Sequence, residues 1–397
     1  MNPQPSLDTQ QAIQRVLRLM EIPGISCNET AVSEAIINEL KDAGAEISQF
    51  RYDDANTRTR LAGAVGNLMF FLPGREGSPR RLLSAHMDTV PVCEGAKPVV
   101  DGEQIRSADP NTGLGGDDRA GCAAILTAAL EAMKLNGSHP PLVFTWFIQE
   151  EIGLQGAHHL NTETLGPIDL AFNFDGGSVD KVTVGATGGE RMEIQIIGRP
   201  SHAGVAPEEG ISAIAISALA IARLQQEGWH GRVEKPEGRG TSNVGVIQGG
   251  NATNVVTAEV RLRAEARSHD AAMRKRIVDE IRAAFEWAIA QVKSADGQTG
   301  SMHFQSNLDY DSFRLADDAE VVQVAAAAIK SLGRTPFTYV AGGGLDANWL
   351  YKHGIPAVTI GCGQRNIHTI AETLDVREYL DACRVAIALA CECESVV

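Results

Sequence analysis

The stretch Leu142-Val-Phe-Thr-Trp-Phe-Ile148 decides the fold prediction for this chain. Its side chains are apolar apart from one threonine, which is typical of a central strand that helices bury on both faces. Arg81-Leu-Leu-Ser-Ala-His86 and Leu170-Ala-Phe-Asn-Phe174 have the same character, and each ends in polar residues. Helical patterns such as residues 119–134 lie between these runs. The sequence therefore predicts an α/β fold, in which functional sites form outside the strand ends.

The pattern changes near Gly185, which indicates an insertion in the α/β domain. From Val256 to Glu265 apolar and polar residues alternate, as in a strand with one wet face, and residues 269–293 predict a long helix. The α/β pattern then resumes. The simplest organisation is a first part of the α/β domain, an inserted α+β domain and a second part of the α/β domain, at residues 1–185, 186–300 and 301–397.

Composition limits the classes of partner. The chain has 397 residues and a formal net charge of −15, which argues against nucleic acid and anionic membranes, because both need a basic patch. The most apolar segment, residues 213–222, is too short to span a bilayer, which takes roughly 20 residues. The start of the chain has no secretory pattern, and seven irregularly spaced cysteines suggest reduced thiols. We expect a cytoplasmic protein.

Two acidic residues, Glu150 and Glu151, lie just after the predicted strand at residues 142–148. Adjacent carboxylates at the end of a buried strand repel each other unless a cation or a proton lies between them. Neighbouring side chains on a regular strand point in opposite directions, so one could bind a metal ion while the other contacts the bound water. The pair therefore predicts a functional role for these two residues rather than a purely structural one.

Two further motifs carry possible ligands. His86 and Asp88 are two residues apart, so Asp88 could accept the ring N–H of His86 and fix its tautomer. Asp117 and Asp118 follow glycines at the start of a predicted helix, a position that also suits simple capping. The segment 113–118 lacks the third glycine of a dinucleotide fingerprint, and no Walker lysine follows it.

The last two motifs complete the set. Asp175 ends the strand at residues 170–174, and His368 follows a predicted strand at residues 357–360. Taken singly, a histidine such as His368 is more typical of a core or surface residue. Five such motifs, four of them at strand ends, indicate a metal centre, because zinc takes histidine nitrogen and carboxylate oxygen.

The five motifs together resemble the co-catalytic zinc peptidases, the family of peptidase T (the tripeptidase), glutamate carboxypeptidase and acetylornithine deacetylase. Gly116-Asp-Asp-Arg-Ala-Gly121 and Asp175-Gly-Gly177 are more similar to the peptidase T branch. The resemblance covers almost the whole chain. It implies a mixed sheet of the zinc-exopeptidase type flanked by helices, with residues 186–300 as a lid and dimerisation domain.

The resemblance also implies a site with two divalent ions per chain, Zn²⁺ first and Co²⁺ or Mn²⁺ as alternatives. Asp117, rather than Asp118, would bridge the ions, because the family reads an acid, any residue, a basic residue and then small residues. Asp88 would orient a histidine ligand, and Glu150 would be the general base. The implied ligands are the bridge Asp117, with His86 and Asp175 at one ion and Glu151 and His368 at the other.

Three residues of the predicted lid match functional positions of the family. His202, in Gly198-Arg-Pro-Ser-His202-Ala-Gly204, matches a histidine that binds the developing oxyanion and in dimeric relatives reaches a neighbouring subunit's site. A loop histidine with a local hydrogen bond is the alternative. Asn254 and Arg267 match a pair that holds a substrate carboxylate in some relatives, a task that suits the two-pronged arginine. A surface arginine is the alternative. A homodimer through the lid is a further implication.

The sequence thus predicts a metallopeptidase of short peptides, similar to a tripeptidase or aminopeptidase, in which metal ions activate water and Glu150 takes its proton. The alternatives are a carboxypeptidase and an amidohydrolase that releases amino acids from N-acyl or N-carbamoyl groups. A catalytically silent binding protein on the same fold is a third reading, against which the complete ligand set counts. The expected partner is a short peptide or an N-acyl amino acid, with neither nucleic acid nor membrane.

Overall fold

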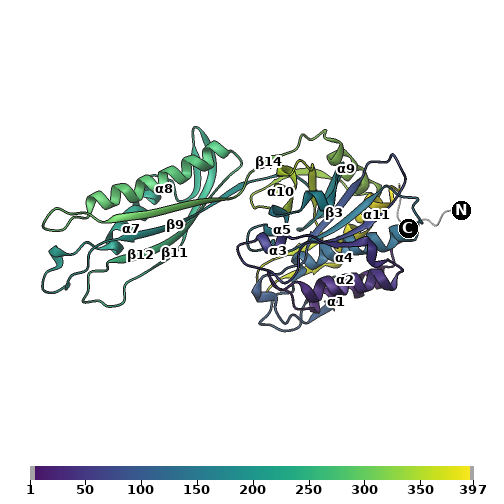
Figure 1. Cartoon of the computed structure of the whole chain (residues 1–397), viewed down its shortest axis with the longest axis horizontal. Helices are drawn as coiled ribbons and strands as arrows, with labels where there is room; N and C mark the ends of the chain where they lie inside the picture. Colours follow the sequence, from purple (N-terminus) through teal and green to yellow (C-terminus); the bar gives the residue numbers. More distant parts are fainter. Residues whose placement is uncertain (1–4, 394–397) are drawn as a thin grey trace. The chain divides into compact units, whose positions relative to one another are not determined.

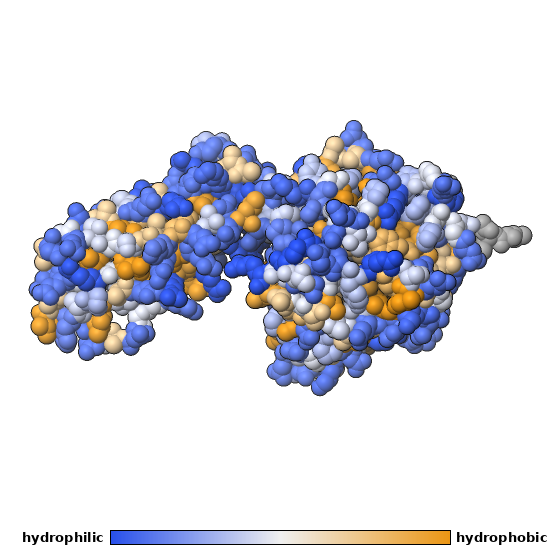
Figure 2. Space-filling view, viewed as in Figure 1, coloured by the Kyte–Doolittle hydropathy of each residue, from blue (hydrophilic) through white to orange (hydrophobic). Residues whose placement is uncertain are grey.

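The computed structural model describes residues 5–393, which divide into two compact units (Figure 1). The larger unit contains the residues up to Gly185, Arg314–Ala341 and the residues from Leu345 onwards. The smaller unit contains Ala186–Phe313 and Gly342–Gly344. The visible surface of both units is mainly hydrophilic, in keeping with the charge of the chain (Figure 2).

The larger unit is built on a mixed β-sheet, which has nine strands among the described residues. Their order is β1 (Phe50–Tyr52), β2 (Leu68–Leu72), β6 (Leu142–Phe147), β3 (Arg81–His86), β7 (Leu170–Phe174), β16 (Ala357–Ile360), β8 (Lys181–Ala186) and β14 (Phe313–Arg314), with β15 (Phe337–Ala341) also paired to β8. Strands β6, β3, β7 and β16 are parallel, whereas β2 is antiparallel to β6 and β8 is antiparallel to β16. The parallel strands are buried, so the prediction of a central mixed sheet is confirmed.

Helices flank this sheet. They are α1 (Thr9–Glu21), α2 (Thr30–Asp42), α3 (Ala55–Arg58), α4 (Gly116–Met133), α5 (Gln155–His158), α6 (Thr162–Leu165), α9 (Glu320–Ser331), α10 (Asp346–Lys352) and α11 (Val376–Cys391). Helix α4 packs against β3 and β7, and α1 and α11 pack against α4. The close approach of α4 depends on Gly121, since a Cβ there would lie 2.2 Å from the carbonyl oxygen of Phe174.

A smaller sheet of the larger unit positions one loop of interest. Its strand order is β17 (Gln364–Arg365), β18 (Thr373–Asp375), β5 (Gln104–Ser107) and β4 (Pro98–Asp101), and all pairs are antiparallel. The loop between β17 and β18 carries His368, whose φ of 63° lies in the left-handed region. Short 3-10 helices occur at Ile47–Gln49 and Pro91–Cys93.

The smaller unit pairs an antiparallel sheet with helices on one of its faces (Figure 1). The strand order is β10 (Gly231–Lys235), β11 (Gly238–Gly249), β12 (Glu259–Ser268), β9 (Gly188–Ile197) and β13 (Ser301–Tyr310), and the helices are α7 (Ala213–Gln226) and α8 (Ala271–Gln291), with a 3-10 turn at Pro207–Glu209. On β12, Val260 and Leu262 belong to the core, whereas Arg261 and Arg263 are exposed, as the alternating pattern predicted. Strand β13 follows residue 300 but pairs with β9, so it lies in this unit.

Within residues 5–393, none of the helices combines the length and the apolar character that a membrane crossing requires.

Candidate metal centre

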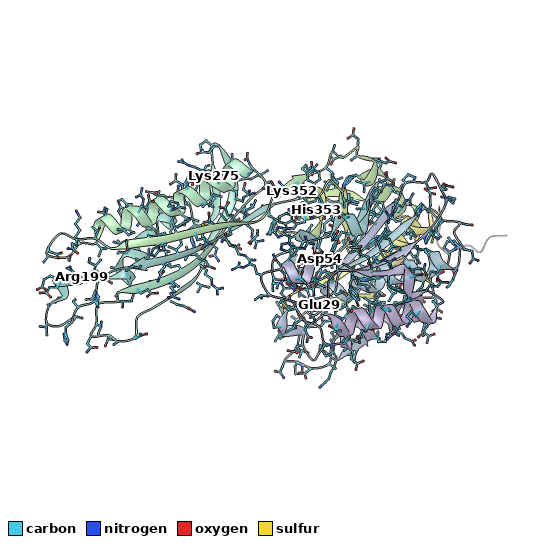
Figure 3. All side chains as sticks on the ribbon, viewed as in Figure 1. Glu29, Asp54, Arg199, Lys275, Lys352 and His353 are labelled. Carbon is cyan, nitrogen blue, oxygen red and sulfur yellow. The ribbon has the colours of Figure 1, made fainter. Side chains whose placement is uncertain are left out.

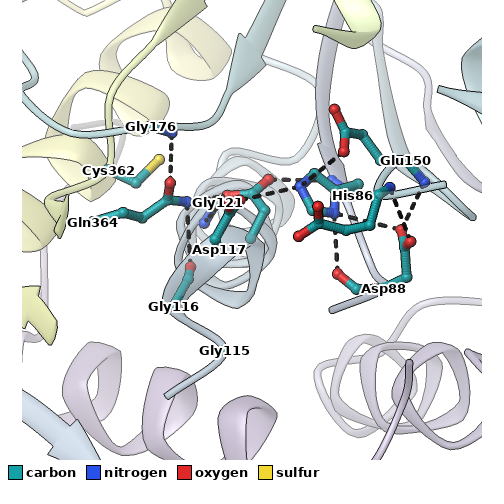
Figure 4. Close-up of polar contacts among 12 residues, drawn as sticks. His86, Asp88, Gly115, Gly116, Asp117, Gly121, Glu150, Gly176, Cys362 and Gln364 are labelled. Atoms are coloured by element: carbon teal, nitrogen blue, oxygen red, sulfur yellow. Dashed lines mark hydrogen bonds and ion pairs between the residues drawn. The ribbon is translucent and has the colours of Figure 1, made fainter. Parts of the chain in front are cut away.

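The predicted ligands of the larger unit meet at one edge of its sheet, and Figure 4 shows His86, Asp117 and Glu150 there. His86 is the last residue of β3, Glu150 and Glu151 follow β6, and Asp175 follows β7. These strands are parallel, so their carboxyl ends share an edge. Helix α4 begins at the same edge and brings in Asp117.

Asp117 lies between two histidines. Its Oδ1 is 3.2 Å from Nε2 of His86, and its Oδ2 is 3.2 Å from Nε2 of His368. The same nitrogen of His368 is 2.9 Å from Oε2 of Glu151. Burial opposes ionisation, but hydrogen bonds from His368 and His86 lower the pKa of Asp117 below its usual range. A carboxylate with one histidine at each oxygen has the geometry of a bridge between two cations.

The ring of His86 is held by Asp88. Nδ1 of His86 is 3.0 Å from the backbone oxygen of Asp88 and 3.4 Å from its Oδ1, so Nδ1 carries the proton and donates it. Nε2 then faces Asp117 and lies 4.0 Å from Oε2 of Glu150. Burial opposes the charged ring, but Glu150 and the hydrogen bonds of both aspartates raise the pKa of His86. The arrangement leaves Nε2 able to bind a metal ion.

Asp118 is buried beside Asp117, and its oxygens are engaged by the protein. Oδ2 accepts the backbone N–H of His86 at 3.1 Å, and Oδ1 accepts the backbone N–H of Gly121 at 3.0 Å. Nε2 of Gln364 donates to the same Oδ1 at 2.8 Å. Ligand atoms of His86, Asp118 and Asp175 do lie within 4.8 Å of one another, as do those of His86, Asp117 and Glu151. The hydrogen bonds of Asp118 nevertheless favour Asp117 as the bridging ligand.

The acidic residues of the centre repel each other. Burial, followed by the charge of Asp117, raises the pKa of Asp175 to about 7. Burial is also the largest cause of the raised pKa of Glu150 and of Glu151, with neighbouring carboxylates adding to it. Divalent cations would relieve this repulsion, and imidazole and carboxylate groups are suitable ligands for zinc. The donor set therefore fits a metal centre.

Two supporting residues were missed by the sequence reasoning. Glu372 is 2% exposed and accepts backbone N–H groups at the start of α4, from Leu114 at 2.9 Å and Gly115 at 2.8 Å in the preceding loop and from Asp117 at 3.0 Å in the helix. Gln364 accepts the N–H of Gly176 at 2.8 Å through its Oε1, besides its bond to Asp118 (Figure 4). Glu372 and Gln364 each lie four residues from His368 in sequence, and this closeness was the available signal.

The predicted lid residues lie in the smaller unit. His202 is exposed in a loop whose Ala203 N–H donates to the backbone oxygen of Asn254 at 2.9 Å, so this loop and the Asn254 turn are neighbours. Arg267 lies on β12, where its Nε and Nη2 donate to Glu265 at 3.1 and 2.9 Å. From Glu259 to Arg267 the strand extends roughly 26 Å, at about 3.3 Å per residue. The structure therefore does not bring Asn254 and Arg267 together within one chain.

Residues 82–392 match peptidase family M20/M25/M40. The chain belongs to this family. It is 31% identical over 384 residues to the uncharacterized protein YqjE of Bacillus subtilis, a match that covers 96% of this chain and 98% of that protein.

Two solved structures are similar throughout. The first is a tripeptidase from Staphylococcus aureus, with a TM-score of 0.86 and 31% sequence identity. The match covers 97% of this chain and 98% of the tripeptidase. The second is aminopeptidase PepT from Bacillus cereus, with a TM-score of 0.83 and 32% sequence identity. The match covers 97% of this chain and 99% of the aminopeptidase. The prediction of a peptidase T-like branch is confirmed, and the chain is a peptide-hydrolysing metallopeptidase.

Proposed function

We propose that this M20 peptidase is a two-metal exopeptidase that hydrolyses short peptides, with tripeptides as its main substrates. The observation that carries the proposal is the position of Asp117, whose oxygens each lie 3.2 Å from a histidine Nε2. The similarity to a tripeptidase and to an aminopeptidase supports the substrate class.

The proposed ligands supply two sites that share one carboxylate. The ions are proposed to be Zn²⁺, with Co²⁺ or Mn²⁺ as alternatives. When bound, two divalent ions supply a nucleophile at neutral pH and polarise the scissile carbonyl. The proposed ligands are Asp117 between the ions, His86 and Asp175 at one ion, and Glu151 and His368 at the other.

Glu150 is the proposed general base. It follows the same strand as Glu151 but lies on the His86 side of the centre, with Oε2 4.0 Å from Nε2 of that histidine. Its carboxylate takes a proton from the attacking water and passes it to the leaving nitrogen. Asp88 does not touch the substrate in this scheme, since its carboxylate faces Nδ1 of His86 and keeps the ring oriented.

Arg267 is the proposed ligand of the substrate's carboxylate end. Glu265 occupies its Nε–Nη2 edge, whereas Nη1 lies 4.0 Å from the place that a Cβ would take at Gly343. This leaves Nη1 as the edge of the guanidinium that is proposed to meet the carboxylate. A charge-assisted contact of this kind contributes about 1.5–3 kcal/mol.

His202 and Asn254 are proposed to act together, His202 as a donor to the developing oxyanion. They lie on neighbouring loops at the opposite end of β12 from Arg267. If all three serve one site, the His202 end and the Arg267 end must come from different chains. We therefore propose a homodimer through the smaller unit. The seven cysteines form no disulfide in the described structure, which fits the reducing cytoplasm that we propose as its location.

The test is hydrolysis of matched tripeptides with free, N-acylated and C-amidated ends by enzyme loaded with Zn²⁺, Co²⁺ or Mn²⁺. We expect the free tripeptide to be the best substrate. Arg267→Ala should lower kcat/KM for the free tripeptide about 10- to 150-fold and barely change that for the amidated one. Arg261→Ala, an exposed arginine on the same strand, is the matched control.

The panel also separates the alternatives. Faster release from N-acyl or N-carbamoyl amino acids than from peptides would make the enzyme a deacylase instead. Equal rates on free and amidated tripeptides would remove the carboxylate role of Arg267. No hydrolysis with any of the three metals would favour a binding protein on the same fold.

A further inference from the structure

Three consecutive backbone N–H groups in the turn after β6 donate to buried carboxylates. The N–H of Gln149 donates to Oε1 of Glu29 at 3.1 Å. The N–H of Glu150 donates to Oδ1 of Asp88 at 2.9 Å, and the N–H of Glu151 donates to Oδ2 of Asp88 at 3.2 Å. The turn that presents the proposed base is therefore held through its backbone by Asp88 and Glu29.

Gln149 has an unusual conformation for a residue with a side chain. Its φ is 52°, in the left-handed region, where non-glycine residues are strained unless their surroundings hold them. The turn then closes on itself, with the N–H groups of Gly153 and Leu154 donating to the backbone oxygen of Glu150 at 2.9 and 2.7 Å. Because Gln149 directly precedes Glu150, its backbone conformation sets the direction in which the Glu150 side chain leaves the strand.

Glu29 is fully buried at the start of α2 in the larger unit (Figure 3). The same Oε1 accepts the N–H of Cys27 at 2.9 Å, and the neighbouring Ser26 hydroxyl donates to Asp88 at 2.6 Å. Burial, followed by the charge of Asp88, raises the pKa of Glu29 to about 7. The segment at residues 26–29 thus contacts both carboxylates that hold the turn.

We propose that Glu29 is a positioning residue for catalysis, which holds Gln149 in its left-handed conformation and thereby aims the carboxylate of Glu150. Glu29 acts through the N–H of Gln149 and not through a contact with substrate or metal. The inference rests on the proposed role of Glu150 as general base. It extends the catalytic machinery to a segment that the five metal-site motifs do not include.

The first test compares Glu29→Ala with Glu29→Gln in the metal-loaded enzyme. Glu29→Ala leaves the N–H of Gln149 without its acceptor, and we expect kcat to fall about 10- to 100-fold while KM changes less than about 3-fold. The metal content should match that of the wild type. Glu29→Gln keeps an acceptor oxygen and should restore kcat to within about 3-fold of the wild type.

Ile36→Val is the control for general loosening of α2. Ile36 is fully buried on that helix, seven residues from Glu29 in sequence, and its shortening weakens packing without removing a hydrogen bond of the turn. We expect this variant to lower the melting temperature and to leave kcat unchanged. An equal loss of kcat in Ile36→Val and Glu29→Ala would overturn the proposal, as would a normal kcat in Glu29→Ala or no rescue by Glu29→Gln.

A second readout needs no turnover. Hydrogen–deuterium exchange of residues 147–154 in the metal-loaded, substrate-free enzyme should speed up in Glu29→Ala and stay close to the wild type in Glu29→Gln and Ile36→Val. Unchanged exchange in Glu29→Ala would overturn the positioning role even if the wild type cleaved no peptide. A wild type that is inactive on every tripeptide would instead count against the proposed function, so the two failures are distinguishable.

Discussion

Replacing Glu372 by alanine should weaken both the larger unit and its metal centre. The carboxylate is buried and accepts the N–H groups of Leu114, Gly115 and Asp117. No other side chain in the described structure is bonded to these three groups at once. Glu372 thus ties the segment after His368 to the loop that carries the proposed bridging ligand.

The size of the effect follows from the lost bonds. A buried donor left without a partner costs about 1–3 kcal/mol, and the three backbone donors are affected together with the weaker Cys93 thiol donor. Neighbouring losses are not additive, because one rearrangement or one entering water can serve several groups. We therefore expect Glu372→Ala to lower the unfolding free energy of the larger unit by about 3–5 kcal/mol. Glu372→Gln keeps one acceptor oxygen and should cost about half as much.

Urea unfolding of the metal-free protein, followed by circular dichroism, measures this loss in the transition of the larger unit. Glu94→Ala, at an exposed glutamate in the same region, is the control and should stay within about 0.5 kcal/mol of the wild type. Metal titration should also show weaker binding in Glu372→Ala, since the backbone of Asp117 loses its anchor. A free energy and metal affinity equal to those of Glu94→Ala would refute the reasoning.

Three more predictions concern the centre. Chelation should abolish peptide hydrolysis, and two metal ions per chain should return with activity on adding zinc; a ratio that stays at one would rule out the two-ion centre. Glu150→Gln should keep both ions and lose at least about 100-fold in kcat, as expected for a general base, whereas Glu151→Gln should weaken metal binding, and the reverse pattern would exchange their roles. His202→Ala should lower kcat about 100-fold at unchanged metal content. Mixing it with Glu150→Gln chains should restore activity if His202 acts across a dimer, and no restoration after proven subunit exchange would exclude that.

The amino-acid sequence alone was sufficient for the architecture and the family. The apolar run that ends at Ile148 is typical of a strand buried on both faces, so its residue pattern indicates a central strand. Polar residues at the ends of such runs meet at one edge of the sheet where the strands are parallel, as β3, β6 and β7 are. That is why the metal-site motifs, and with them the peptidase family, could be recognised from residue order.

Tertiary structure decided which groups support that centre. Asp117 and Asp118 are adjacent in sequence, and the family resemblance implied Asp117 as the bridge. The hydrogen bonds that Asp118 accepts from His86, Gly121 and Gln364 give a physical reason for that choice, which the sequence did not contain. Glu29 meets Gln149 across 120 residues of chain, and no local pattern encodes that meeting.

The same limit applies to the smaller unit. The spacing of Asn254 and Arg267 suggested a pair, but Asn254 precedes the start of β12 at Glu259, whereas Arg267 lies near the end of this extended strand. The order of apolar and polar residues along a strand or helix reflects which of its side chains are buried, so burial can be predicted from the local sequence. A hydrogen bond between distant segments depends on where the packed core places their backbones, and the folded chain alone determines that.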